Sequence, residues 1–234
     1  MAAILKRELN AYFSSAIGYI FLAVFYAFAG FYFFLSNVLS NTTDMRSFFS
    51  SMFSVIMFLI PILTMRLMSE DKKLRTDQAL LTAPVGLYSI VLGKYLSAVI
   101  MYLVAMAITV VYAVVLAAFA PIDLSLFVGN LLGAVFLGLA LIAIGVFISS
   151  LTESQVIAAV ASFAVMMGLM LIDTLSSVMP TQFLQDLVYG LSFYTRYANF
   201  TLGLLNIADV IFFLSVSGLF IFFTVRVLEK KRWS

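Results

Sequence analysis

Six stretches of the sequence are each apolar over about 20 residues, the length that an α-helix needs to cross the hydrocarbon core of a membrane. They run approximately over residues 16–36, 48–67, 90–118, 125–150, 155–175 and 207–227. Lipid cannot satisfy an exposed strand edge, so each stretch is predicted to be a helix. Of the 234 residues, 64% are hydrophobic and 10% are charged, which is too little polar surface for a water-soluble globule. We therefore expect an all-α integral membrane protein with six transmembrane helices.

The basic residues favour one orientation of these spans. With the N-terminus inside, Arg46 and Arg196 fall outside. The other eleven basic residues then lie on the cytoplasmic side: Lys6, Arg7, Arg66, Lys72, Lys73, Arg75, Lys94, Arg226, Lys230, Lys231 and Arg232. Both termini are expected to be cytoplasmic, as an even number of spans requires. Ala27-Phe28-Ala29 imitates a signal-peptidase site, but the apolar run continues to Leu35, so we expect an uncleaved first span.

Three segments lie outside the regular spans. Residues 1–15 predict an interfacial amphipathic helix, because Leu5, Leu9, Tyr12 and Phe13 fall near one side of it. Residues 67–84 form a long polar stretch on the cytoplasmic side. Residues 176–206 are apolar but interrupted by proline and glycine, and we expect short helices in the outer leaflet there, before span six.

The composition excludes several kinds of chemistry. The chain has no cysteine and no histidine, which removes thiol chemistry and the usual zinc sites. The spacing of Gly86 from Gly93-Lys94 does not fit a phosphate-binding loop, and the net charge of +2 indicates no nucleic-acid partner. Asp173 and Asp209 fall at span ends, where they are interpreted as interface markers. We expect no metal, no cofactor and no catalytic residue in this chain.

The polar segment 67–84 has two interpretations. Leu67, Leu74 and Leu81 recur every seven residues, while Glu70 and Asp71 point to the other side of the predicted helix. Mixed charges on a surface helix can simply be solvated. Alternatively, the segment is a docking helix whose charged side and Leu80–Pro84 end meet a cytoplasmic partner, with Pro84 ending the helix.

Several blocks of sequence resemble those of type-2 ABC transporter permeases, most closely the gliding-motility-associated permeases. The blocks are Arg7-Glu8-Leu9 with Tyr12-Phe13, Pro61-Ile62-Leu63-Thr64-Met65-Arg66-Leu67 running into Glu70-Asp71-Lys72, Leu80-Leu81-Thr82-Ala83-Pro84-Val85, Val91-Leu92-Gly93-Lys94, Phe147 to Gln155, and Asp209 to Trp233. The resemblance covers nearly the whole chain. This sequence has Ser14-Ser15-Ala16 where such permeases often have Ser-Pro, so a bend into span one would lack its proline.

The resemblance implies a permease subunit of an ATP-driven exporter in a bacterial plasma membrane, working by alternating access. Its partners would be cytoplasmic ABC ATPase subunits, which bind ATP and Mg, and a second permease copy or a paralogue; an extracytoplasmic accessory subunit is a further candidate. The positions that match the ATPase-coupling region are Glu70, Asp71, Lys72, Arg75, Leu80, Leu81, Thr82, Ala83 and Pro84, and Glu153 in the turn between spans four and five is a second contact. Two other classes stay open: a small channel or secondary carrier, and a membrane scaffold that transports nothing.

Two further patterns carry predictions. Tyr194, Arg196 and Tyr197 belong to an aromatic cluster before span six, which is interpreted as an interfacial anchor or, alternatively, as an exit gate. Gly129, Gly133 and Gly138 in span four predict close contact between helices.

Overall fold

A computed structural model describes residues 1–76, 85–178 and 190–233 of the chain. Within these ranges, every regular element is helical. The elements are α1 (Ala2–Ser14), α2 (Ala16–Phe33), the π-helix η1 (Phe34–Val38), α3 (Arg46–Thr64), α4 (Arg66–Lys73), α6 (Leu87–Ala117), α7 (Leu124–Leu151), α8 (Gln155–Val178), α10 (Phe193–Thr201) and α11 (Ile207–Trp233).

Among the described residues, six segments are long and apolar enough to cross a membrane. They are Ala16–Val38, Arg46–Lys73, Leu87–Ala117, Leu124–Leu151, Gln155–Ile172 and Ile207–Arg232. These segments coincide with the six predicted stretches to within a few residues at most ends, so the prediction of six helical spans is confirmed. The second span is longer than predicted, because it continues past a break at Met65 into α4.

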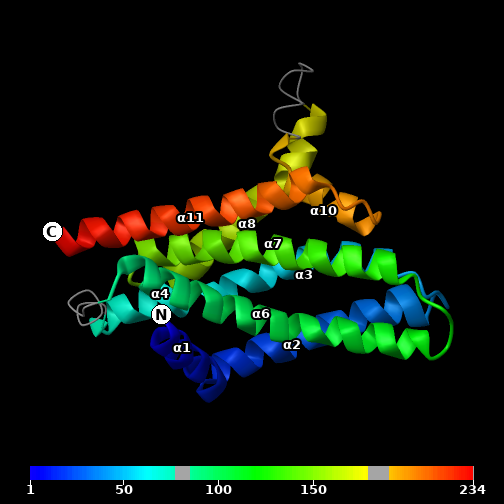
Figure 1. Cartoon of the computed structure of the whole chain (residues 1–234), viewed down its shortest axis with the longest axis horizontal. Coiled ribbons are helices and arrows are strands. Elements are labelled where there is room, and N and C mark those ends of the chain that lie inside the picture. Colours follow the sequence, from blue (N-terminus) through cyan, green and yellow to red (C-terminus); the bar gives the residue numbers. More distant parts are fainter. Residues whose placement is uncertain (77–84, 179–189, 234) are drawn as a thin grey trace.

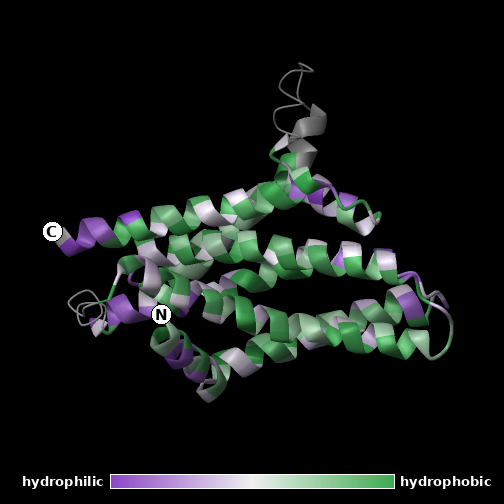
Figure 2. Ribbon diagram, in the orientation of Figure 1, coloured by the Kyte–Doolittle hydropathy of each residue, from purple (hydrophilic) through white to green (hydrophobic). Residues whose placement is uncertain are grey.

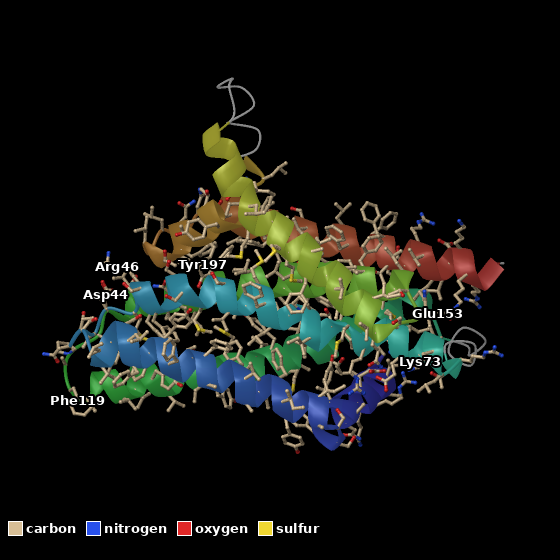
Figure 3. All side chains as sticks on the ribbon, turned by 180° about the vertical axis from the view of Figure 1, so that it is seen from behind. Asp44, Arg46, Lys73, Phe119, Glu153 and Tyr197 are labelled. Atoms are coloured by element: carbon tan, nitrogen blue, oxygen red, sulfur yellow. The ribbon has the colours of Figure 1, made fainter. Side chains whose placement is uncertain are left out.

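The long helices lie side by side, and α7 is in their middle (Figure 1), where it packs against α3, α6, α8, α10 and α11. Both chain termini and α4 lie at one end of the bundle, which we call the α4 end. Asp44 lies at the opposite end, the Asp44 end (Figure 3). Hydrophilic residues gather at the two ends while the middle is hydrophobic (Figure 2), as expected for a chain that spans a bilayer.

Three glycines allow α7 to approach its neighbours closely. A Cβ atom would lie 2.5 Å from Phe200 Cβ at Gly133, 2.2 Å from Tyr102 Cε1 at Gly138, and 2.2 Å from Thr64 Oγ1 at Gly145. The three contacts come from α10, α6 and α3 in turn. The close helix contacts predicted from span-four glycines are therefore confirmed, and small residues at such positions let the helices approach.

The outer helices keep large apolar faces uncovered. Side chains such as Tyr19 and Phe31 of α2, Val156 of α8 and Ile211 of α11 are more than half exposed. By contrast, α3 and α7 are largely buried. An apolar face of this kind requires lipid or another apolar surface as its surroundings.

The N-terminal helix α1 is joined to the first span by a sharp bend. Ser15 is extended, with φ −110° and ψ 152°, which ends α1 without a proline. Gly18 makes the bend possible, since a Cβ atom there would lie 2.2 Å from the Tyr12 carbonyl oxygen. The buried face of α1 consists of Ile4, Glu8 and Tyr12. Of the predicted apolar side, Tyr12 is therefore buried, whereas Leu5 and Leu9 are only partly buried and Phe13 is exposed.

The helix predicted over 67–84 ends early in the structure. The described helix, α4, ends at Lys73, and Arg75 adopts the left-handed region with φ 56°. Leu67 is buried but Leu74 is 62% exposed, so the predicted seven-residue stripe is wrong for these two leucines. The reason is that α4 continues span two and buries its side chains against α7 and α8 instead of lying on the membrane surface. Residues 77–84, including Leu80–Pro84, lie outside the described residues.

The segment predicted to contain outer-leaflet helices holds one described short helix, α10. It begins at Phe193, where the Ser192 hydroxyl accepts a hydrogen bond from the Thr195 amide at 3.0 Å, a typical N-cap. Helix α8 continues to Val178, and residues 179–189 lie outside the described part of the chain. The segment therefore packs, through α10, against α3, α7 and α8.

Candidate functional site

Lys94 is buried in α6 at the α4 end, and only 2% of its side chain is exposed. Its ammonium lies 3.0 Å from Glu8 Oε1, 2.6 Å from Asp71 Oδ2 and 2.5 Å from the Leu67 carbonyl oxygen. An ammonium has three N–H donors, so these three acceptors match it fully. The acceptors belong to α1 and α4. Lys94 therefore joins three helices at one point.

Arg7 completes this group of charges, which we call the ionic cluster: Arg7, Glu8, Asp71 and Lys94. The Arg7 Nη2 atom lies 2.5 Å from Glu8 Oε1 and 3.1 Å from Asp71 Oδ2. The two carboxylates, whose side chains are 10% and 15% exposed, are thus shared between two cations and the cluster has no net charge. Buried charges are stable when they are paired and hydrogen-bonded in this way.

A second set of polar contacts holds the bend between α1 and α2. Arg66 Nη1 donates to the Ser15 hydroxyl at 2.8 Å, and Arg66 Nε lies 2.9 Å from Glu70 Oε2. The Arg66 guanidinium also lies over the Tyr12 ring, 5.4 Å from its centroid. Tyr12 in turn donates to the Leu63 carbonyl at 2.8 Å. The N-terminal segment is consequently fixed to the junction of α3 and α4.

Helix α7 contacts α4 through two serines near its end. The Ser149 hydroxyl accepts hydrogen bonds from the amides of Met68 and Ser69 at 3.1 and 3.2 Å, and it donates to the Met65 carbonyl at 3.0 Å. These bonds satisfy backbone groups at the break between α3 and α4. Lys72 donates to the Ser150 carbonyl. Helix α4 is thereby attached to the turn that carries Glu153.

The predicted coupling residues divide into two groups. Asp71 was expected to face away from the membrane domain, but its side chain points inward to Lys94 and Arg7. The reason is that α1 and the start of α6 cover that side of α4. Glu70 pairs with Arg66, and Lys72 contacts α7. The exposed members are Arg75 and Glu153. The remaining predicted positions, Leu80–Pro84, lie outside the described residues.

Exposed side chains of α4 and the following turn lie at the same end of the bundle as Glu153 (Figure 3). Lys73, Leu74 and Arg75 are all exposed, and Glu153 lies at the same end of the bundle as Lys73 (Figure 3). We call these four residues the α4 surface. An exposed leucine flanked by charged side chains is typical of a protein contact with an apolar centre and a polar rim.

The sequence interpretation missed Glu8 and Lys94 as partners. The available signal was the spacing of Ile4, Glu8 and Tyr12, which places a carboxylate on the same face as two apolar residues. A charge on such a face requires a partner of opposite sign. The partner could not be identified, because Lys94 is 86 residues away in the sequence.

The three residues of the predicted exit gate have different environments. Tyr194 is 42% exposed, with its ring edge-on to Phe53. Tyr197 is fully buried and donates to the Phe49 carbonyl at 2.7 Å, so it fastens α10 to α3 (Figure 3). Arg196 pairs with Asp209 of α11 at 2.8 Å. Asp209, interpreted from the sequence as an interface marker, is therefore a buried contact between two helices.

Comparison with known proteins identifies the family of the chain. Among the described residues there is no group of three acidic side chains that could hold a metal ion. Comparison with curated proteins gives no match. A family model described as "ABC-2 family transporter protein" matches residues 39–227, which is well over half of the chain and includes four of the six spans in full and most of the last. The chain therefore belongs to the ABC-2 transporter family.

Proposed function

We propose that this chain is the permease subunit of an ATP-driven exporter of the gliding-motility-associated subgroup. Members of the ABC-2 family are membrane transport components that generally work with ATPase subunits. In this proposal the α4 end faces the cytoplasm of a bacterium, both termini are cytoplasmic, and α10 lies in the outer leaflet of the plasma membrane. ATP and Mg bind to the partner subunit.

The observation that carries the proposal is the convergence of α1, α4 and α6 on Lys94. A partner that displaced α4 would also act on the N-terminal helix and on the third span, because the ionic cluster joins them. Ser149 and Lys72 extend the connection to α7. A displacement at one small surface would thus reach several spans together, as alternating access between two permease halves requires.

The α4 surface is the proposed contact with the ATPase. Its members, Lys73, Leu74, Arg75 and Glu153, are all exposed at the α4 end (Figure 3). Glu70 lies at the edge of this surface, and its carboxylate is paired with Arg66. Asp71 belongs to the ionic cluster, so its role is to position α4 and not to contact the partner. Leu80–Pro84 remain part of the proposed coupling region.

The proposed gate, Tyr194 with Arg196 and Tyr197, would work through α10. Tyr197 and the pair of Arg196 with Asp209 hold this helix against α3 and α11. Movement of the gate would therefore require the Arg196–Asp209 contact to open while Tyr194 remains exposed to the exit side.

The test is the introduction of negative charge at the α4 surface. The full chain would be co-expressed with a candidate ABC ATPase of the same organism. The Lys73→Glu/Leu74→Glu variant would be compared with Lys230→Glu, a change at an exposed position at the same end. We expect the α4-surface variant to lose co-purification and ATP hydrolysis in nanodiscs, with membrane insertion intact. Full coupling in that variant would refute the assignment, and solute leak from liposomes without any ATPase would favour a channel.

A further inference from the structure

Two cavities lie at the Asp44 end, on either side of the loop between η1 and α3. The first, about 250 Å³, lies between this loop and the start of α7 and is lined by Asp44, Asp123 and Asn130, among others. The second, about 330 Å³, lies between the ends of η1 and α6 and includes Asn37. Thr42 and Thr43 contribute to both, so the cavities adjoin.

Each cavity contains a buried asparagine with an unused acceptor. Asn130 is 1% exposed, and its Nδ2 donates to the Leu126 carbonyl at 2.7 Å. Asn37 is 2% exposed, and its Nδ2 donates to the carbonyls of Thr42 and Asp44, both at 3.1 Å. Neither Oδ1 atom has a hydrogen-bond partner among the described residues. Rotating either amide by 180° would place its oxygen against a carbonyl, so these orientations are fixed by their surroundings.

A buried carbonyl oxygen without a partner costs about 1–3 kcal/mol, and such groups in native proteins call for an explanation. Asn130 is the stronger case, because the cavity that it lines also contains two carboxylates. Asp123 uses Oδ1 to cap α7, accepting from the amides of Ser125 and Leu126 at 2.9 and 3.2 Å. Its second carboxylate oxygen is not needed for that cap.

The charge of this first cavity is negative. Its lining contains Asp44 and Asp123 but no lysine or arginine. Arg46, outside the lining, donates to Asp44 Oδ2 at 2.7 Å, and this hydrogen bond lowers the pKa of the Asp44 carboxyl. Asp44 is consequently ionised at neutral pH. The lining thus offers hydrogen-bond acceptors and negative charge, which together suit a cation that donates hydrogen bonds.

We propose that the cavity between the 42–45 loop and the start of α7 binds a primary ammonium group. The ammonium would donate to Asn130 Oδ1 and to the second carboxylate oxygen of Asp123. Its charge would be balanced by Asp123, because Asp44 is already paired with Arg46. The Asn130 oxygen has almost no contact with solvent, so binding includes a small displacement of the loop. The ammonium can belong to a free amine or to the headgroup of an aminophospholipid.

The test compares ligands that differ only in their N–H donors. Ethanolamine and choline are both cations with a hydroxyl group, but the trimethylated nitrogen of choline cannot donate. The thermal unfolding of the purified full chain would be measured with each, and native mass spectrometry would compare the retention of phosphatidylethanolamine and phosphatidylcholine with the same acyl chains. A rise in Tm with ethanolamine but not choline would identify a site for free amines. Retention of phosphatidylethanolamine at least fivefold greater than that of phosphatidylcholine, without a rise in Tm with ethanolamine, would identify a lipid site.

Three variants assign the effect to this cavity. Asn130→Leu removes the unpaired oxygen, and Asp123→Asn keeps a cap acceptor for α7 while removing a charge. Ser162→Ala is the matched control, because the Ser162 hydroxyl is another buried atom without a partner among the described residues but lies outside this cavity. We expect the preference for the primary amine to disappear in the first two variants and to persist in the control. Equal binding of both headgroups and both free cations, or an unchanged preference in Asp123→Asn, would overturn the proposal.

Discussion

Replacing Lys94 with methionine removes the ammonium while keeping a side chain of similar length, so it isolates the electrostatic role of the ionic cluster. The change leaves two largely buried carboxylates, on Glu8 and Asp71, with Arg7 as their shared cation. The cluster then carries a net charge of −1. Removing one partner from a buried ion pair costs about 3–5 kcal/mol, and Lys94 is buried enough for the full cost to apply.

A double-mutant cycle measures the coupling between Lys94 and Glu8. Glu8→Gln alone leaves the cluster with a net charge of +1, which Arg7 can carry because its side chain is 45% exposed; we expect a cost of about 1–2 kcal/mol. The Lys94→Met/Glu8→Gln variant retains the pair of Arg7 with Asp71 and is neutral. We expect its destabilisation to be about 2 kcal/mol smaller than the sum of the two single changes, within the range measured for directly contacting residues.

The assay is unfolding of the purified chain in one detergent, followed by circular dichroism. For a chain of this size, about 3–5 kcal/mol corresponds to a decrease in Tm of roughly 6–20 °C. Lys6→Met is the control, because Lys6 is an exposed lysine of α1 and its removal should cost less than about 0.5 kcal/mol. Additive effects of Lys94→Met and Glu8→Gln would refute the reasoning, since they would mean that the two side chains do not interact.

Two further predictions concern helix packing. Gly138→Ala places a methyl group against the buried Tyr102 ring and should cost about 1–3 kcal/mol of stability. Its control is Gly168→Ala, where nothing lies within 4 Å and the change should be neutral or stabilising. A thermal shift of equal size in both variants would contradict the contact at Gly138. Asp209→Asn removes the charge that holds Arg196 and should cost about 1–2 kcal/mol and speed proteolysis near α10. The exposed pair of Arg226 with Glu229 provides the control Glu229→Gln, and an equal loss of stability there would contradict the role of Asp209.

The six spans could be predicted because each depends on a local property, the length of an apolar stretch. The bend at Ser15 could not, since an extended serine is stabilised there by Arg66 and by the space that Gly18 leaves. Similarly, the end of α4 depends on Arg75 adopting a positive φ. Such a conformation is uncommon for a residue other than glycine, and nothing in the local sequence indicated it.

The predicted coupling region stays a prediction, and the internal arrangement of the ionic cluster could not be predicted from the sequence. Of the polar segment predicted after span two, Asp71 belongs to the ionic cluster, whereas Arg7, Glu8 and Lys94 come from other parts of the sequence. The inward orientation of Asp71 was not foreseen, because a single helix shows only that the residue is on a polar side. Which polar side remains in water depends on what packs there. In this chain Glu8 and Lys94 pack there, and both come from other helices.

The glycines of α7 restrict how the length of this helix can change. Each residue advances an α-helix by about 100°, so deleting one residue before Gly133 would rotate all three glycines away from Phe200, Tyr102 and Thr64 together. Bulkier side chains would then meet three neighbouring helices at once. Insertions and deletions in related chains should therefore fall in the connections on either side of α7, and the stretch from Gly133 to Gly145 should align between relatives without gaps.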